Sequence, residues 1–445
     1  MEMEADKENS QSQTGVPVIL GPVDDEHKKN HKVPLIIRGR LNPGPVRIKT
    51  DIEGLYFDFN DGARVLLPKG NYNVRFINSE TDYTIFSVDA SDVMVMTTKK
   101  YFISYRIEVR RDDCQEPVWI HEYNAKNKKV FLKYPTSGIL GDCLAWFPYA
   151  EEFRKQHGAE VYVVVNQKMA EILKPGYPEL HFITRTEKDE KEGKWPDELP
   201  EDIYATYYLT VPFIDENRLL QPVDYRTIGL HTNAAMILGL DPKIEHPPRL
   251  LPSPQARKER QIKEPYVCIA VNGSFQTKQW NNAGGWINVI RHLKKLGYRV
   301  LCIDREDFHQ AGSYCNSIPF GSEDFTGNKP LQERIDLLYH ADFFVGIGSG
   351  LSWLAWGVGK PVVLISGFSL PYTEFYTPYR VINLDVCNGC WNDMRIHFNN
   401  TDAAWCPRHK NTDRQFECSR NITPEYVNKV IDKLIKNEGL TPPNR

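Results

Sequence analysis

The second half of the chain alternates short apolar runs with amphipathic segments, and this alternation constrains the fold more than any other feature. The predicted series, in chain order, is strand 266–271, helix 286–296, strand 299–303, helix 330–340, strand 342–346, helix 351–358 and strand 361–365. Strands and helices in alternation favour a parallel sheet with helices on both faces. We therefore expect a Rossmann-like lobe here.

A similar pattern occurs earlier in the chain. Residues 129–134 predict a strand, a helix is expected from Asp142 to about Gly158, and residues 160–165 predict the next strand, which together make a βαβ unit. Residues 184–202 are strongly charged and predict a loop, and residues 241–264 are rich in proline and charge, as in a linker. The chain is thus expected to be an α/β protein with two Rossmann-like lobes.

The N-terminal part has a different pattern. Residues 1–31 are charged and poor in apolar side chains, which predicts a disordered tail. Short apolar runs separated by turn residues follow, and the predicted strands are 34–37, 46–48, 55–57, 65–67, 83–86, 93–96 and 102–107. We expect a small all-β domain, either a barrel or a sandwich.

The predicted boundaries follow from these changes of pattern. They are a tail over 1–31, a β-domain over 32–111, a first lobe over 112–250, a second lobe over 251–380, a cysteine motif over 381–422 and a final helix over 423–445. Thr423 is the expected N-cap of that helix, with Pro424 at its first position. Its expected apolar stripe is Val427, Val430, Ile431, Leu434 and Ile435.

The composition excludes several functional classes. The chain has 445 residues and a net charge of −3, which argues against broad binding to nucleic acid or to an anionic membrane. It has no apolar run long enough to cross a bilayer, and its first residues lack the apolar core of a secretory signal. A soluble cytoplasmic protein is expected.

The loop before the first predicted lobe helix is a candidate ligand site. It runs from Thr136 to Asp142 at the carboxyl end of a strand, where open α/β sheets bind their ligands. Its glycines allow a ligand to approach the backbone. Asp142 can take a proton from a hydroxyl nucleophile, or it can simply cap the helix.

Two loops of the second lobe reach the same edge of its sheet. In residues 273–280, the Ser274 hydroxyl and the Lys278 ammonium suit a diphosphate. Residues 346–352 are rich in glycine and open a helix, so they predict an anion site. Residues 304–306 lie at that edge too, and can contact a ribose or phosphate or form an exposed charged loop.

Four of the nine cysteines crowd together near the C-terminus, at Cys387, Cys390, Cys406 and Cys418. Their spacing is C-x₂-C-x₁₅-C-x₁₁-C, and Asn388-Gly389 permits the tight turn between the first two. Four thiolates supply a full tetrahedral set for zinc or a single iron. Such a site has no open position, so a structural metal is expected.

These motifs resemble the bacterial lipopolysaccharide heptosyltransferases and, more closely, the bacterial autotransporter heptosyltransferase family. The resemblance covers residues from about 32 to 435, and its motifs occur in order along both lobes. It is carried by residues 137–142, 278–280, 285–286, 342–352, 368–376 and 387–390. In the lipopolysaccharide enzymes the phosphate loop reads Asp-Thr-Gly with a histidine just after, where this chain has Gly348-Ser349-Gly350 and Trp353.

The resemblance implies a GT-B type glycosyltransferase that moves heptose from ADP-heptose to Ser or Thr hydroxyls of an autotransporter passenger protein, with inversion. It implies Asp142 as the general base, Lys278 at the diphosphate, structural iron at one ion per chain, and a homo-dodecamer. The expected substrate-binding residues are Ser137, Gly138, Ile139, Leu140, Gly141, Ser274, Lys278, Arg305, Glu306, Ser349, Gly350 and Leu351.

Two other functional classes remain open on the sequence, because a fold does not fix a chemistry. One is a nucleotide-sugar epimerase or hydrolase, which would release an isomer or free sugar. The other is a non-catalytic scaffold built on the β-domain and a metal motif, which need not bind an ADP-sugar.

Overall fold

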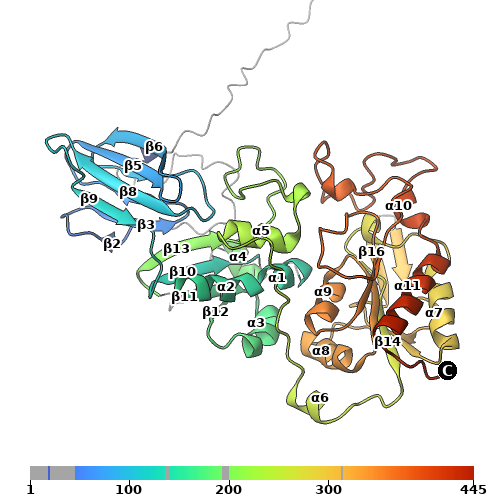
Figure 1. Cartoon of the computed structure of the whole chain (residues 1–445). Coiled ribbons are helices and arrows are strands. Elements are labelled where there is room, and N and C mark those ends of the chain that lie inside the picture. The colour runs from blue at the N-terminus through green and yellow to red at the C-terminus, as the bar shows by residue number, and fades with distance from the viewer. Residues whose placement is uncertain (1–18, 21–45, 136–139, 193–199, 312–313, 445) are drawn as a thin grey trace, which may run out of the picture.

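The computed structural model describes residues 19–20, 46–135, 140–192, 200–311 and 314–444. The N-terminal strands, the first α/β lobe and the second α/β lobe lie in a row, as Figure 1 shows. The predicted strand 34–37 and most of the predicted tail lie outside the described residues. Residues 19 and 20, within that tail, form strand β1 (Ile19–Leu20), which pairs with β7 (Met94–Met96).

The N-terminal strands form a sandwich rather than a closed barrel. One layer is an antiparallel sheet in the order β6 (Tyr83–Ala90), β5 (Tyr72–Asn78), β8 (Tyr105–Arg111) and β9 (Trp119–Glu122). The other layer contains β2 (Ile48–Lys49), β3 (Tyr56–Asn60), β4 (Arg64–Leu66) and β7. Aromatic rings join the layers, with the centroids of Phe57 and Trp119 4.9 Å apart.

The sequence prediction missed β5 and β9. Strand β5 has no uninterrupted apolar run, because apolar side chains at Tyr72, Val74 and Phe76 alternate with polar ones. That alternation is typical of a strand with one buried face, and the buried positions of β5 follow it.

The second sandwich layer continues into the first lobe. The described part of this sheet has the order β1-β7-β4-β3-β13-β10-β11-β12, with β2 on β3. Strand β3 runs parallel to β13 (Ile203–Tyr208), and the Asn60 amide donates a 2.7 Å hydrogen bond to the Ile203 carbonyl. The boundary expected at residue 111 therefore does not separate two sheets.

The first lobe has parallel strands β10 (Lys129–Lys133), β11 (Glu160–Val165), β12 (His181–Thr184) and β13. The single helix predicted after β10 is two helices, α1 (Leu140–Trp146) and α2 (Pro148–His157), because Pro148 has no N–H to continue the first. Its other helices are α3 (Gln167–Leu173), α4 (Glu187–Glu192) and α5 (Leu230–Ile237). Helix α4 lies in the charged segment predicted to be a loop, and residues 193–199 of that segment are outside the described residues.

The second lobe has the predicted parallel sheet, in the order β18-β15-β14-β19-β20-β21. Its strands are β14 (Tyr266–Ala270), β15 (Arg299–Cys302), β18 (Glu323–Asp324), β19 (Phe344–Ile347), β20 (Val362–Ile365) and β21 (Arg380–Val381). A hairpin of β16 (Phe308–Ala311) and β17 (Tyr314–Ser317), which the sequence analysis did not predict, follows β15.

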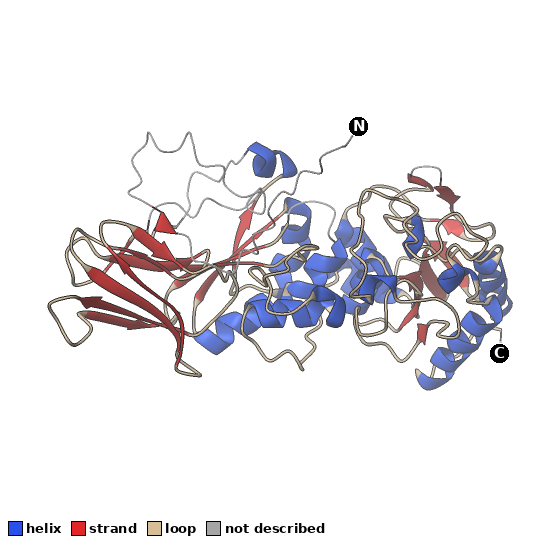
Figure 2. Cartoon of the chain, turned by 90° about the horizontal axis from the view of Figure 1, so that it is seen from above, coloured by secondary structure: helices blue, strands red, loops and turns tan. Residues whose placement is uncertain are grey.

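Helices cover both faces of this sheet. Helices α7 (Gly285–Lys295) and α11 (Pro424–Asn437) pack in one apolar core, and α8 (Leu331–His340) and α9 (Gly350–Gly357) pack in the other. The predicted cap and stripe of α11 are confirmed: the Thr423 side chain accepts from the Tyr426 N–H, and the five stripe residues are buried. Figure 2 shows from above that helices surround the strands of the part of the chain that ends at the C-terminus.

The remaining elements are short. Helix α6 (Pro254–Lys258) lies in the segment predicted as a linker. Residues 387–418, hereafter the cysteine segment, are mostly loop, with a 3-10 turn at Cys390–Asn392 and α10 (Glu417–Arg420) at the end. None of the described helices is both long and apolar enough to cross a membrane.

Candidate active site

A cavity of about 730 Å³ is lined by residues of both lobes. Among the predicted catalytic and substrate-binding residues, those that the structure describes all line it: Leu140, Gly141, Asp142, Ser274, Lys278, Arg305, Glu306, Ser349, Gly350 and Leu351. Ser137, Gly138 and Ile139 lie outside the described residues. Loops more than 200 residues apart in the chain thus meet at one place, as expected from the carboxyl ends of two parallel sheets.

The lobes meet where α1 approaches α9. A Cβ atom added at Gly350 would lie 2.9 Å from the Leu140 Cβ, and one added at Gly141 would lie 3.0 Å from the Trp353 ring. Real Cβ atoms essentially never approach other heavy atoms closer than 3.0 Å, and contacts of 3.0 to 3.4 Å are tighter than most. Glycine at both positions therefore lets the first turns of the two helices converge on the cavity.

Asp142 lies inside the first turn of α1 and is not its N-cap, since the helix begins at Leu140. Its side chain lines the cavity and is half-buried. Burial raises the pKa of the Asp142 carboxyl, and the nearby Lys278 ammonium opposes this shift. A carboxylate with a raised pKa that faces a cavity is suited to accept a proton.

Lys278 ends a short 3-10 turn, Gln276–Lys278, in the loop after β14. The cysteine segment holds this turn: the Thr277 hydroxyl donates to the Trp405 carbonyl at 2.6 Å, and the Gln276 N–H donates to the Ala403 carbonyl at 2.9 Å. The position of the Lys278 ammonium in the cavity therefore depends on residues beside Cys406.

The start of α9 adds hydrogen-bond donors. Among the described residues, the buried Ser349 hydroxyl has no hydrogen-bond partner, and it does not cap the helix. The first N–H groups of a helix have no acceptor within the helix. Together with Lys278, these groups can hold a diphosphate.

Several cavity residues were not singled out from the sequence. On the first lobe they are Asn166, Gln167, Lys168, Arg185 and Thr186, and on the second they include Asn272, Asn328, Arg334 and Glu374. The first group follows β11 and β12 directly, so the carboxyl-end rule that identified Asp142 could have identified it too. Glu374 lies in a long loop after β20, within the segment 368–376 that carries the family resemblance, but the sequence analysis gave it no role.

Asp304 plays a different part from the one considered from the sequence. Its buried carboxylate accepts the N–H groups of Val271 and Asn272, at 2.8 and 3.2 Å, and burial raises its pKa to about 6. It therefore ties the end of β15 to the end of β14, while Arg305 and Glu306 are exposed beside it.

The four clustered cysteines are neighbours in space. Cys390, Cys406 and Cys418 are buried, and the Cys418 pKa is raised to about 12 by burial and by the thiols of Cys390, Cys406 and Cys387. Gly389 has a φ of 65°, which fits the predicted tight turn. The Arg408 guanidinium donates to the Cys387 sulfur at 3.4 Å, so a positive charge lies beside the thiols.

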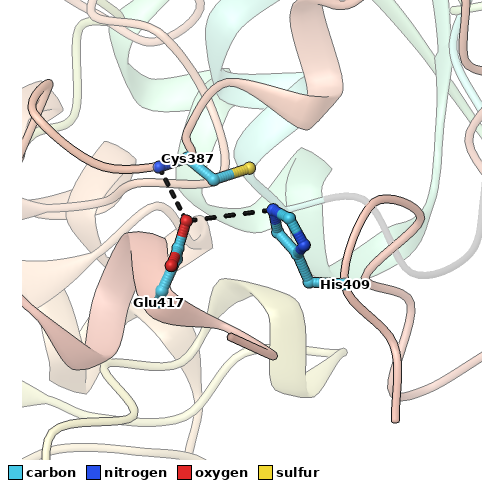
Figure 3. Close-up of side chains that lie close together, drawn as sticks. All are labelled: Cys387, His409 and Glu417. Carbon is cyan, nitrogen blue, oxygen red and sulfur yellow. Dashed lines mark hydrogen bonds and ion pairs between the residues drawn. The ribbon is translucent and has the colours of Figure 1, made fainter. Parts of the chain in front are cut away.

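The tightest group of possible metal ligands among the described residues is Cys387, His409 and Glu417, shown in Figure 3. The Glu417 carboxylate already accepts the Cys387 N–H at 3.0 Å and two bonds from Arg414, at 2.6 and 2.9 Å. Arg414 and these other donors hold the Glu417 pKa at about 2. Glu417 is thus well satisfied without a metal ion.

The comparisons with known proteins agree with this geometry. Residues 52–113 match the family described as glycosyltransferase TibC, N-terminal domain, and residues 229–397 match glycosyltransferase family 9 (heptosyltransferase). The autotransporter heptosyltransferase TibC of Escherichia coli O78:H11 is 49% identical over 395 residues, which is 88% of this chain and 93% of TibC.

The chain is also similar to a solved structure and to a further relative. The crystal structure of dodecameric iron-containing heptosyltransferase TibC in complex with ADP-D-beta-D-heptose superposes with a TM-score of 0.82 at 46% identity, covering 89% of this chain and 99% of that one. BimC of Burkholderia thailandensis, named an inactive autotransporter heptosyltransferase, is 38% identical over 400 residues, or 89% of this chain and 90% of BimC. Similarity alone therefore does not distinguish an active protein from an inactive one.

The contact between α1 and α9 can be tested by a double-mutant cycle. Gly350→Ala should lower the free energy of unfolding by about 1–3 kcal/mol, because the new methyl group overlaps Leu140. Leu140→Ala keeps the Cβ but removes the Cγ and Cδ2 atoms, 3.0 and 3.1 Å from the added methyl group, so the double variant should lose less than the sum of the two single losses. Denaturant unfolding measures all three, and strictly additive losses would contradict the contact.

Proposed function

The chain belongs to the autotransporter heptosyltransferase family, and on that premise we propose that it moves heptose from ADP-heptose to Ser or Thr hydroxyls of an autotransporter passenger protein. The family is one of glycosyltransferases. The observation that carries the proposal is that the Asp142 carboxyl and the Lys278 ammonium, one from each lobe, face the same cavity. This supports an active enzyme, which family membership alone does not.

The diphosphate of the donor lies between Lys278 and the start of α9. Lys278 supplies one positive charge, Ser349 a hydroxyl, and Gly350 and Leu351 backbone N–H groups. Ser274, Arg305 and Glu306 line the same side and contact the remainder of the nucleotide. As the bond to the sugar breaks, these groups stabilise the negative charge that develops on the leaving ADP.

Asp142 acts on the acceptor from the first lobe. Its carboxylate accepts the proton of the Ser or Thr hydroxyl as the hydroxyl oxygen bonds to the anomeric carbon. The bond from that carbon to the diphosphate oxygen breaks on the opposite side, so the anomeric centre inverts. The products are the glycosylated side chain, ADP and the proton on Asp142.

Cys387, Cys390, Cys406 and Cys418 hold one iron ion per chain, with zinc as the alternative. Four neighbouring thiols fit such an ion, since thiolates are the soft ligands that iron and zinc prefer, and Arg408 offsets part of their charge. Bound by the four thiolates, such an ion would tie the cysteine segment together and would leave no position for substrate. Thr277 and Gln276 hydrogen-bond to the cysteine segment, so an ordered segment would also hold Lys278 in place.

The assembly and location follow from the same premise. A homo-dodecamer is the proposed assembly, as in the TibC crystal structure, and mass photometry of the purified protein tests it. The proposed location is the cytoplasm, because all nine cysteines are free and thiolate ligands persist in a reducing compartment. Neither a hydrolase nor a non-catalytic scaffold is favoured by any contact among the described residues.

Asp142→Asn tests the chemistry. The substitution keeps the size of the side chain, so the protein should fold and bind ADP-heptose, but transfer should fall by about 10²–10⁴-fold. Mass spectrometry of the passenger protein measures transfer. Glu152→Gln, on α2 and outside the cavity, is the matched control and should be near wild type. Near wild-type transfer by Asp142→Asn would show that the base lies elsewhere.

The pH dependence tests the coupling between the lobes. Transfer requires ionised Asp142, so kcat should fall as the pH drops through the raised pKa of this carboxyl. Lys278 opposes the raised pKa, and Lys278→Met should therefore move the acid limb of kcat to higher pH. The measurement is kcat at saturating donor across the acid range. An acid limb that stays in place or moves to lower pH would contradict the coupling.

Metal analysis tests the ligand set. Cys406→Ser should lose the ion, lower the unfolding temperature and weaken ADP binding, because Trp405 no longer holds Thr277. Cys114→Ser, outside the cluster, is the control and should keep about one ion per chain. Elemental analysis of His409→Ala separates the two possible sets: retention of the ion supports four thiolates, and its loss supports the Cys387–His409–Glu417 group.

A further inference from the structure

Glu374 is a charged side chain in the cavity wall that the proposed chemistry does not use. It is 7% exposed and lies in the loop between β20 and β21. Its Oε1 accepts a 2.6 Å hydrogen bond from the Ser369 hydroxyl, and its Oε2 pairs with Arg380 at 2.8 Å. Arg380 also donates to the Ser369 carbonyl at 2.8 Å, so the carboxylate is held in one orientation.

Gly348 keeps this carboxylate open to the cavity. A Cβ atom at residue 348 would lie 2.8 Å from the Glu374 Oε1. Gly348 itself lines the cavity and comes directly before Ser349. The absence of a side chain at residue 348 therefore places the Glu374 oxygen next to the proposed diphosphate site.

The chemistry of the carboxylate limits what it can bind. A carboxylate has about four acceptor positions and no donor, and the hydrogen bonds from Ser369 and Arg380 use about half of them. It repels phosphate and attracts groups that donate a hydrogen bond. In ADP-heptose the diphosphate carries adenosine at one end and the sugar at the other. The sugar is rich in hydroxyl groups, which can donate hydrogen bonds to the carboxylate.

We infer that Glu374 is a specificity-determining residue that accepts hydrogen bonds from hydroxyl groups of the donor sugar. This inference rests on the proposed function, because it requires a nucleotide-sugar in the cavity. Glu374 then makes the site prefer the complete donor to ADP alone. A donor that lacks the matching hydroxyl leaves the buried carboxylate without its partner, and such sites discriminate strongly.

The test compares ADP-heptose with ADP. Glu374→Gln should lower kcat/KM for ADP-heptose by about 10- to 100-fold, the loss expected for a hydrogen bond to a charged group. Its affinity for ADP, measured by calorimetry, should stay within about 2-fold, because ADP has no sugar on the diphosphate. Ser366→Ala is the control: the Ser366 hydroxyl contacts Ser369 at 2.9 Å but not the carboxylate, and both values should remain near wild type.

A second variant guards against misfolding, since Glu374→Gln leaves the Arg380 charge without its partner. Gly348→Ala keeps every charge, and its new methyl group displaces only the Glu374 oxygen. It should therefore lower kcat/KM for ADP-heptose as Glu374→Gln does and leave the affinity for ADP unchanged. The inference is overturned if either folded variant loses ADP and ADP-heptose equally, or uses ADP-heptose as well as wild type. If the wild-type protein itself does not transfer heptose, the proposed function fails, and that result is seen without any variant.

Discussion

The close approach of α1 to α9 is the constraint on which the site depends. A side chain at Gly350 would overlap Leu140, and one at Gly141 would press on the Trp353 ring, so neighbouring groups would have to shift. With both glycines in place, the first turn of each helix borders one cavity. Asp142 comes from one lobe, and Lys278 and Ser349 come from the other, so the proposed site needs both lobes.

The cysteine segment contacts both lobes and so stabilises their relative position. It holds the turn that carries Lys278 through Thr277, and it also contacts the first lobe. The buried Arg226 guanidinium donates to the carbonyls of Met394 and Ile396, both at 2.9 Å, while Asp224 balances its charge. Trp391, beside Cys390, packs on Tyr225 and lines the cavity. The cysteine segment can therefore influence the proposed catalysis by setting the spacing of the lobes.

Features that depend on local sequence pattern or on strand topology could be predicted from the sequence. Alternating strands and helices led to the second sheet, and the carboxyl-end rule led to Asp142, Lys278 and Ser349. It did not lead to Glu374, whose loop has no periodicity, or to β5, whose apolar residues alternate with polar ones. The shared sheet of the N-terminal domain and the first lobe was also missed, because the pairing of β3 with β13 joins residues far apart in the chain. Asp304 shows the opposite case: its place at a strand end suggested a ligand contact, but its carboxylate binds two backbone N–H groups.

An experimental structure of this protein with ADP-heptose and an acceptor peptide tests the central claim most directly. The account predicts the diphosphate between Lys278 and the start of α9, with the Asp142 carboxylate within hydrogen-bond reach of the acceptor hydroxyl, roughly 2.6–3.2 Å. The hydroxyl oxygen should face the anomeric carbon on the side opposite the diphosphate. A donor bound outside the cavity between the lobes, or an acceptor hydroxyl that Asp142 cannot reach, would contradict it.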